Sequence, residues 1–161
     1  MAAFYLTRLK RLLNVEESVA VALAFLALAI SSYQSFKFFL HLAQYDRSEY
    51  MSWVFLNREE LICLIAASVC LGLTWFGRRK KWLVIANLIW TSISFFVIGG
   101  GIYYAFWFAL TSIANDPAQR QAGLGYLRLE WEHYWYLPIV FLLLLGVWGI
   151  QWRVLYRLRQ S

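Results

Sequence analysis

Residues 31–60 read SSYQSFKFFLHLAQYDRSEYMSWVFLNREE and contain the end of one apolar segment, a polar link and the start of the next segment. Three polar side chains, those of Gln34, Lys37 and His41, interrupt the apolar part of this stretch. Polar groups at membrane depth are costly, so each requires a partner or a route to water. An account of the chain therefore has to explain both the apolar segments and these interruptions.

Four apolar segments are found when the sequence is followed outward from this stretch. We predict helices over about 19–42, 58–77, 82–113 and 134–153, each near the length of about 20 residues that spans a bilayer. The chain has 161 residues, of which 61% are apolar and 19% aromatic, unlike a soluble domain of this size. The predicted fold is an all-α integral membrane protein, one four-helix transmembrane domain over residues 1–161 with external segments at 43–57 and 114–133.

The distribution of charge predicts the orientation in the membrane. Ten of the fifteen basic residues precede the first helix, fill the RRKK link at 78–81 or follow the fourth helix. The positive-inside rule then places both termini in the cytoplasm, in a multi-pass protein of the inner (plasma) membrane. Because the basic residues are divided among three short patches beside the lipid bilayer, we do not expect a nucleic-acid partner.

The ends and turns of the predicted helices carry further signals. Residues 4–13 have the pattern of a short amphipathic helix lying on the membrane surface, after which Asn14 would cap the first span. The third helix is longer than a bilayer requires, and Gly99-Gly100-Gly101 is predicted to be a bend or a close-packing point. A loose internal repeat suggests two similar helical hairpins.

The polar residues late in the first helix allow two interpretations. Ser31, Gln34, Phe38, His41 and Tyr45 recur at steps of three and four, with Lys37 at the edge of the same stripe. Such a stripe packs against protein through interhelical hydrogen bonds, or it forms a ligand or ion site. We favour packing against a protein partner.

A second set of candidates comes from the acids and histidines near the external side. Glu59 and Glu60 open the second helix, where the helix dipole favours acids, and Glu130 and Glu132 precede the fourth. His41 and His133 could ligate haem b, or a metal ion with a neighbouring carboxylate, between the first and fourth helices. No nucleophile–base pair, phosphate loop or CxxC motif is found, so we do not expect an enzyme or a bound cofactor.

The order of these features resembles the small, DctQ-like membrane subunit of tripartite ATP-independent periplasmic (TRAP) transporters. The resemblance rests on Gln34 and Lys37 late in the first helix, Ser52-Trp53 before Glu59-Glu60-Leu61, and YWYLPIVFLLLLGV at 134–147. The motif usual after the second helix of that family is absent, since RRKK runs directly into the third helix. The resemblance implies a non-catalytic subunit that braces a larger polytopic transport subunit and helps to dock a periplasmic binding protein. Glu59, Glu60, Glu130 and Glu132 would then lie on the external docking surface.

Three classes of function therefore stay open. The chain is a transporter subunit, a haem- or metal-binding redox subunit that uses His41 and His133, or a structural or assembly subunit of another membrane complex. The first is the preferred hypothesis. An absorption spectrum of the purified protein would separate the second class from the other two.

Overall fold

The computed structural model describes residues 2–42, 58–77, 80–115 and 134–160, and within these ranges the chain is helical. It forms α1 (Ala2–Leu42), α3 (Arg58–Phe76), α4 (Lys81–Asn115) and α7 (Tyr136–Gln160). Each helix contains a segment long and apolar enough to cross a membrane: Asn14–Lys37, Glu59–Phe76, Lys81–Tyr104 and Tyr136–Arg159. The prediction of an all-α chain with four helices of membrane-spanning length is confirmed. Orientation in the membrane and the similarity of the two halves stay predictions.

The ends of two helices differ from those predicted. The prediction of a separate surface helix over residues 4–13 was wrong, because α1 runs without a break from Ala2 and Asn14 lies inside it. Likewise α7 continues past residue 153 to Gln160. In both places helical backbone hydrogen bonding continues beyond the apolar segment into sequence that carries Arg and Lys. Apolar composition indicates where a helix can enter lipid, and it does not indicate where the helix ends.

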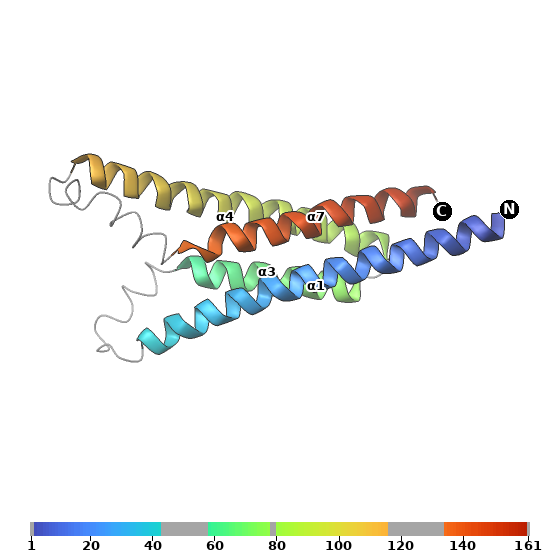
Figure 1. The fold of residues 1–161 in the computed structure, drawn as a ribbon, viewed down its shortest axis with the longest axis horizontal. Coiled ribbons are helices and arrows are strands. Elements are labelled where there is room, and N and C mark those ends of the chain that lie inside the picture. Colours follow the sequence, from blue (N-terminus) through green and yellow to red (C-terminus); the bar gives the residue numbers. More distant parts are fainter. Residues whose placement is uncertain (1, 43–57, 78–79, 116–133, 161) are drawn as a thin grey trace.

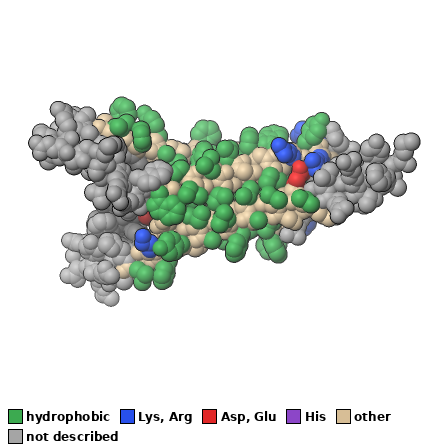
Figure 2. All heavy atoms as spheres, viewed as in Figure 1, with side chains coloured by type: hydrophobic (Ala, Val, Ile, Leu, Met, Phe, Trp, Pro, Cys, Tyr) green, Lys and Arg blue, Asp and Glu red, His purple; other side chains and the backbone are tan. Residues whose placement is uncertain are grey.

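The four helices form a bundle in which each packs mainly against two neighbours, and α3 and α7 make a smaller diagonal contact (Figure 1). α1 contacts α3 and α7, and α4 contacts the same two helices from the other side. The start of α1, the end of α7 and the turn at Gly77 lie at one end of the bundle, which we call the basic end because Lys80, Arg153 and Arg159 lie there. We call the opposite end, where α1 and α4 finish, the far end. Figure 2 shows hydrophobic side chains along the middle of the visible face.

The core combines small residues on two helices with larger ones on a third. Ala20, Ala24 and Ala27 of α1 are fully buried, as are Cys63, Ala67 and Cys70 of α3. Small side chains at helical spacing let the backbones of two membrane helices approach closely. The space beside them is filled by a buried stripe of α7: Leu137, Val140, Leu144 and Val147. The cysteines are free and serve here as small apolar side chains.

Polar side chains connect neighbouring helices at several levels. Asn87 Nδ2 of α4 donates to Thr74 Oγ1 of α3 at 2.8 Å. Trp90 Nε1 donates to the Ala66 carbonyl at 3.1 Å, which also joins α4 to α3. Two further contacts join α7 to α4 and α1: Trp148 Nε1 to Ser92 Oγ at 3.2 Å, and Arg157 to Glu16 at 3.0 Å. Interhelical polar contacts of this kind supplement van der Waals packing in lipid.

Candidate functional site

A buried polar layer lies near the far end of the bundle. Its members are Gln34 and Ser35 on α1, Glu60 on α3 and Tyr136 on α7. Glu60 is 5% exposed, Gln34 is 8% exposed and Tyr136 is fully buried. These residues come from the ends of three different helices, and the bundle brings them into one region.

Helical spacing explains how each helix directs these residues inward. On α1 the buried positions recur at steps of three and four through Ala27, Ser31 and Gln34. On α3 the same spacing links Glu60 with the buried Cys63. Tyr136 opens α7, and Pro138 follows in its first turn, where a missing amide hydrogen does no harm. The layer is therefore set by the packing stripes that also form the core.

The contacts within the layer are few. Ser35 Oγ donates to the main-chain carbonyl of Glu60 at 3.4 Å, a long hydrogen bond that joins α1 to α3. Three buried side-chain atoms of this layer have no hydrogen-bond partner among the described residues: Gln34 Nε2, Glu60 Oε2 and the Tyr136 hydroxyl. Burying such groups unpaired costs free energy. The layer has more of them than the Asn87–Thr74 pair, in which Asn87 Oδ1 is the unpaired atom.

The neighbouring acid, Glu59, faces a different helix. Its Cγ lies 3.7 Å from the position that a Cβ on Gly101 of α4 would occupy. Glu59, Cys63 and Leu137 also line a small cavity of about 10 Å³ between α3, α4 and α7. A volume of this size is near the lower limit for one water molecule. The close-packing role predicted for the Gly99–Gly101 segment is not supported, because a Cβ on Gly101 would make only an ordinary van der Waals contact with Glu59 and a Cβ on Gly100 would meet nothing within 4 Å.

The predicted stripe on α1 divides between the interior and the surface. Ser31 is fully buried and donates from Oγ to the Ala27 carbonyl at 2.8 Å, within its own helix. Gln34 is buried inside this bundle, whereas Lys37, one turn further on, is exposed. His41 lies in the last turn of α1, but its side chain is outside the described part of the structure. Only Lys37 of the described side chains in this stripe is therefore placed to meet a partner at the surface.

The other predicted site residues are distributed as follows. Glu59 is half-buried and Glu60 points into the bundle, and their part in external docking stays a prediction. Glu130, Glu132 and His133 lie outside the described residues, so the proposed haem or metal ligation is not tested. Among the side chains that are described, no three His, Cys, Asp or Glu residues come together in a group that could hold a metal ion.

Two polar residues of the interior were missed by the sequence reasoning. Tyr136 was quoted only as part of the segment at 134–147, but its side chain is fully buried. Asn87 was not singled out, although it is a lone amide within an apolar segment and its side chain is fully buried. The cost of an amide at membrane depth is a signal that could have found it.

Comparison with known proteins finds no match: no family model, no curated protein and no solved structure is similar to this chain. Function is therefore argued from the residues and the bundle.

Proposed function

We propose that the chain is a small, non-catalytic membrane subunit of a multi-subunit transporter, which braces a larger transport subunit. A DctQ-like subunit of a TRAP transporter is the most specific form of this proposal, and docking of a periplasmic partner at the far end would belong to it. The observation that carries the proposal is the length and surface of α1 and α4 at the far end.

Both helices extend beyond what a bilayer requires. The 24 residues Lys81–Tyr104 of α4 are already long and apolar enough to cross a membrane, and the helix continues to Asn115. At 1.5 Å per residue, these further 11 residues add roughly 16 Å beyond the span. Figure 1 shows the ends of α1 and α4 reaching past the first turns of α3 and α7 and moving apart. Neither end is enclosed by the four-helix body.

The side chains on these ends are apolar and exposed. On α4, Phe106 is 62% exposed and Trp107 is 57% exposed, and the Trp107 ring stacks on Tyr103. On α1, Phe36 and Phe39 are also exposed. Lipid can cover such residues within the hydrocarbon core, but residues beyond the span need another apolar surface. A larger membrane subunit that packs between the two ends would supply it.

Co-purification tests the proposal. A tagged chain extracted from its native membrane in a mild detergent is expected to bring a much larger polytopic protein with it. The double variant Phe106→Ala/Leu110→Ala removes exposed side chains one turn apart on the overhanging end and should weaken this association. The matched control, Ile93→Ala/Phe96→Ala, removes exposed apolar side chains inside the span and should leave the association unchanged. Recovery of the tagged chain alone, stable and monodisperse, would overturn the proposal.

A further inference from the structure

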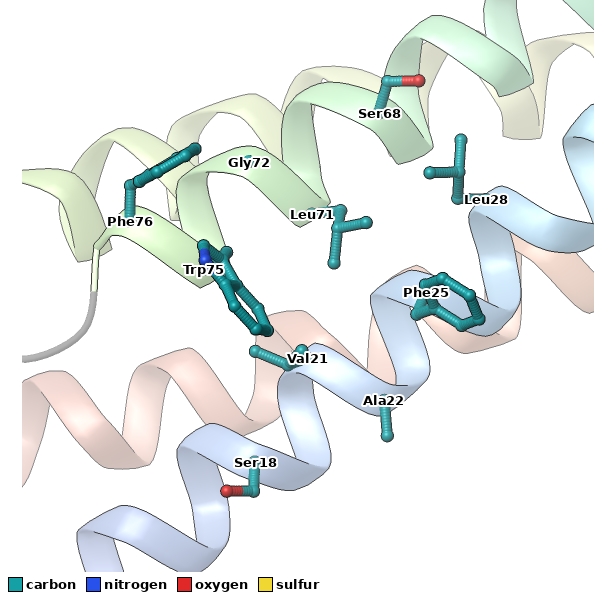
Figure 3. A pocket seen from close by; sticks show the side chains of 10 residues that line it. All are labelled: Ser18, Val21, Ala22, Phe25, Leu28, Ser68, Leu71, Gly72, Trp75 and Phe76. Atoms are coloured by element: carbon teal, nitrogen blue, oxygen red, sulfur yellow. The ribbon is translucent and has the colours of Figure 1, made fainter.

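A long apolar groove runs between α1 and α3 in the half of the bundle nearest the basic end. Its volume is about 730 Å³, and its walls include Val21, Phe25 and Leu28 of α1 and Leu71, Gly72 and Trp75 of α3. Figure 3 shows Leu71 and Trp75 pointing from α3 toward α1, with Val21 opposite Trp75. The groove and the polar layer of Glu60 therefore lie in opposite halves of the bundle.

The walls of the groove offer almost no hydrogen-bonding groups. The two hydroxyls that line it, those of Ser18 and Ser68, donate to carbonyls of their own helices at 2.8 Å (Asn14) and 2.7 Å (Leu64). A Cβ built on Gly72 would meet nothing within 4 Å, so a missing side chain creates part of the space. An occupant of this groove therefore has to be apolar and has no need of hydrogen bonds.

The length of the groove corresponds to one leaflet of a bilayer. Along α1 it extends from Ser18 to Leu28, which is roughly 15 Å at 1.5 Å per residue. The hydrocarbon core of a bilayer is about 30 Å thick, so one leaflet contributes about 15 Å. A transmembrane helix of a partner would need a surface about twice as long. An acyl chain of a single lipid fits the available length.

Positive charge follows the end of α3 that borders the groove. Phe76 lines the groove and ends α3, and the Lys80 amide donates to the Gly77 carbonyl at 2.9 Å, which holds Lys80 close to the end of α3. Lys80 and Lys81 are both exposed. Of the two acids on the adjoining turns of α1, Glu16 is paired with Arg157 at 3.0 Å and Glu17 is buried. The exposed charge beside the groove is therefore cationic.

We propose that this groove binds an acyl chain of an anionic phospholipid, whose phosphate is held by Lys80 and Lys81. The apolar walls take the chain, and the lysines select the headgroup. Basic residues at the membrane surface attract anionic lipids, and basic pockets between membrane helices bind such headgroups. A lysine near the surface contributes about 1 kcal/mol, or roughly fivefold in affinity, so two lysines predict a preference of about twentyfold over a zwitterionic lipid.

Quenching of tryptophan fluorescence tests this proposal, because Trp75 lines the groove and is 53% exposed. The probe is phosphatidylglycerol with brominated acyl chains, titrated into phosphatidylcholine nanodiscs that contain the full chain. The contribution of Trp75 among the nine tryptophans is obtained by subtracting the signal of Trp75→Phe. We expect saturable quenching at a low mole fraction of the anionic lipid, and about twentyfold weaker binding of brominated phosphatidylcholine.

Two pairs of variants localise the effect. Gly72→Leu should fill the groove and abolish the saturable quenching, whereas Gly100→Leu, where a Cβ also meets nothing within 4 Å, should not. Lys80→Gln/Lys81→Gln should remove the headgroup preference, whereas Lys37→Gln at the far end should leave it intact. Ala22→Leu fills the groove from α1 and provides a second blocking variant. Circular dichroism confirms that each variant is folded.

Three results would overturn the proposal. Equal quenching by the anionic and zwitterionic lipids would show that Trp75 meets only bulk lipid. Saturable quenching that persists in both Gly72→Leu and Ala22→Leu would place the lipid elsewhere. A change in oligomeric state of Gly72→Leu in light scattering, with quenching unaltered, would show that the groove receives protein.

Discussion

The hydrogen bond between Asn87 and Thr74 predicts an asymmetric response to mutation. Asn87 is fully buried, and its Nδ2 donates to Thr74 Oγ1 at 2.8 Å, while the Thr74 hydroxyl donates to the Cys70 carbonyl at 2.6 Å. Thr74→Val keeps the shape of the side chain but removes the acceptor, which leaves a buried amide unpaired. Asn87→Leu removes the amide itself, and the Thr74 hydroxyl keeps its bond to Cys70. The first change should therefore cost more than the second.

The expected loss of stability is estimated from two contributions: the interhelical hydrogen bond that is lost and any buried donor that is left unpaired. An interhelical hydrogen bond in a membrane protein contributes about 0.6 kcal/mol on average and about 1.7 kcal/mol at most. An unsatisfied buried donor adds about 1–3 kcal/mol. We expect Thr74→Val to lower the free energy of unfolding by about 2 kcal/mol and Asn87→Leu by about 1 kcal/mol or less. The double variant should resemble Asn87→Leu, which corresponds to a coupling of about 2 kcal/mol, equal to the cost of Thr74→Val alone.

Reversible unfolding in mixed micelles, followed by circular dichroism as the fraction of sodium dodecyl sulfate rises, measures these differences. Thr91→Val is the matched control, because the buried Thr91 hydroxyl donates only within its own helix, to Asn87 at 2.8 Å and Leu88 at 3.2 Å. It should cost less than about 0.5 kcal/mol. The reasoning is refuted if Thr74→Val costs no more than Thr91→Val, or if the two single changes are additive in the double variant.

Three further predictions concern the packing of α3, α4 and α7. Trp90→Phe removes the donor to the Ala66 carbonyl (3.1 Å) and should lower the free energy of unfolding in the same assay by about 1 kcal/mol. Gly77→Ala should cost about 1–3 kcal/mol, because the new Cβ would collide with the Leu73 carbonyl oxygen and the turn would have to shift; no loss would contradict the geometry. Gly149→Ala, where the Cβ meets nothing within 4 Å, should raise the free energy of unfolding by about 0.5–1 kcal/mol, and a loss would reveal a steric contact.

The helices themselves could be predicted because an apolar segment in lipid can adopt few structures other than a helix. A run such as 82–113 has to close its backbone hydrogen bonds internally, and α4 follows it closely, from Lys81 to Asn115. The start of α1 could not be predicted in this way. Residues 4–13 are amphipathic, and an amphipathic sequence is compatible with a helix on the surface or with a continuation of the span.

The site was less accessible to sequence reasoning, because the first helix is apolar on every side. The spacing of Ser31 and Gln34 placed them on one face, but it could not decide whether that face meets this chain or a partner. For Tyr136, an aromatic residue at a helix start looks the same whether it lies in the interface belt or in the core. In both cases the packing of the other three helices decides burial. Local pattern does not contain that information.

The continuity of α1 has a mechanical consequence. At 1.5 Å per residue its 41 residues form a rod of about 60 Å, held along its middle by α3 and α7. Because the rod has no joint, a sideways displacement of Phe39 at one tip has to be accompanied by movement of the opposite tip. A fluorophore attached near Ala2 would therefore report, at the basic end of the bundle, a displacement of the far end of α1.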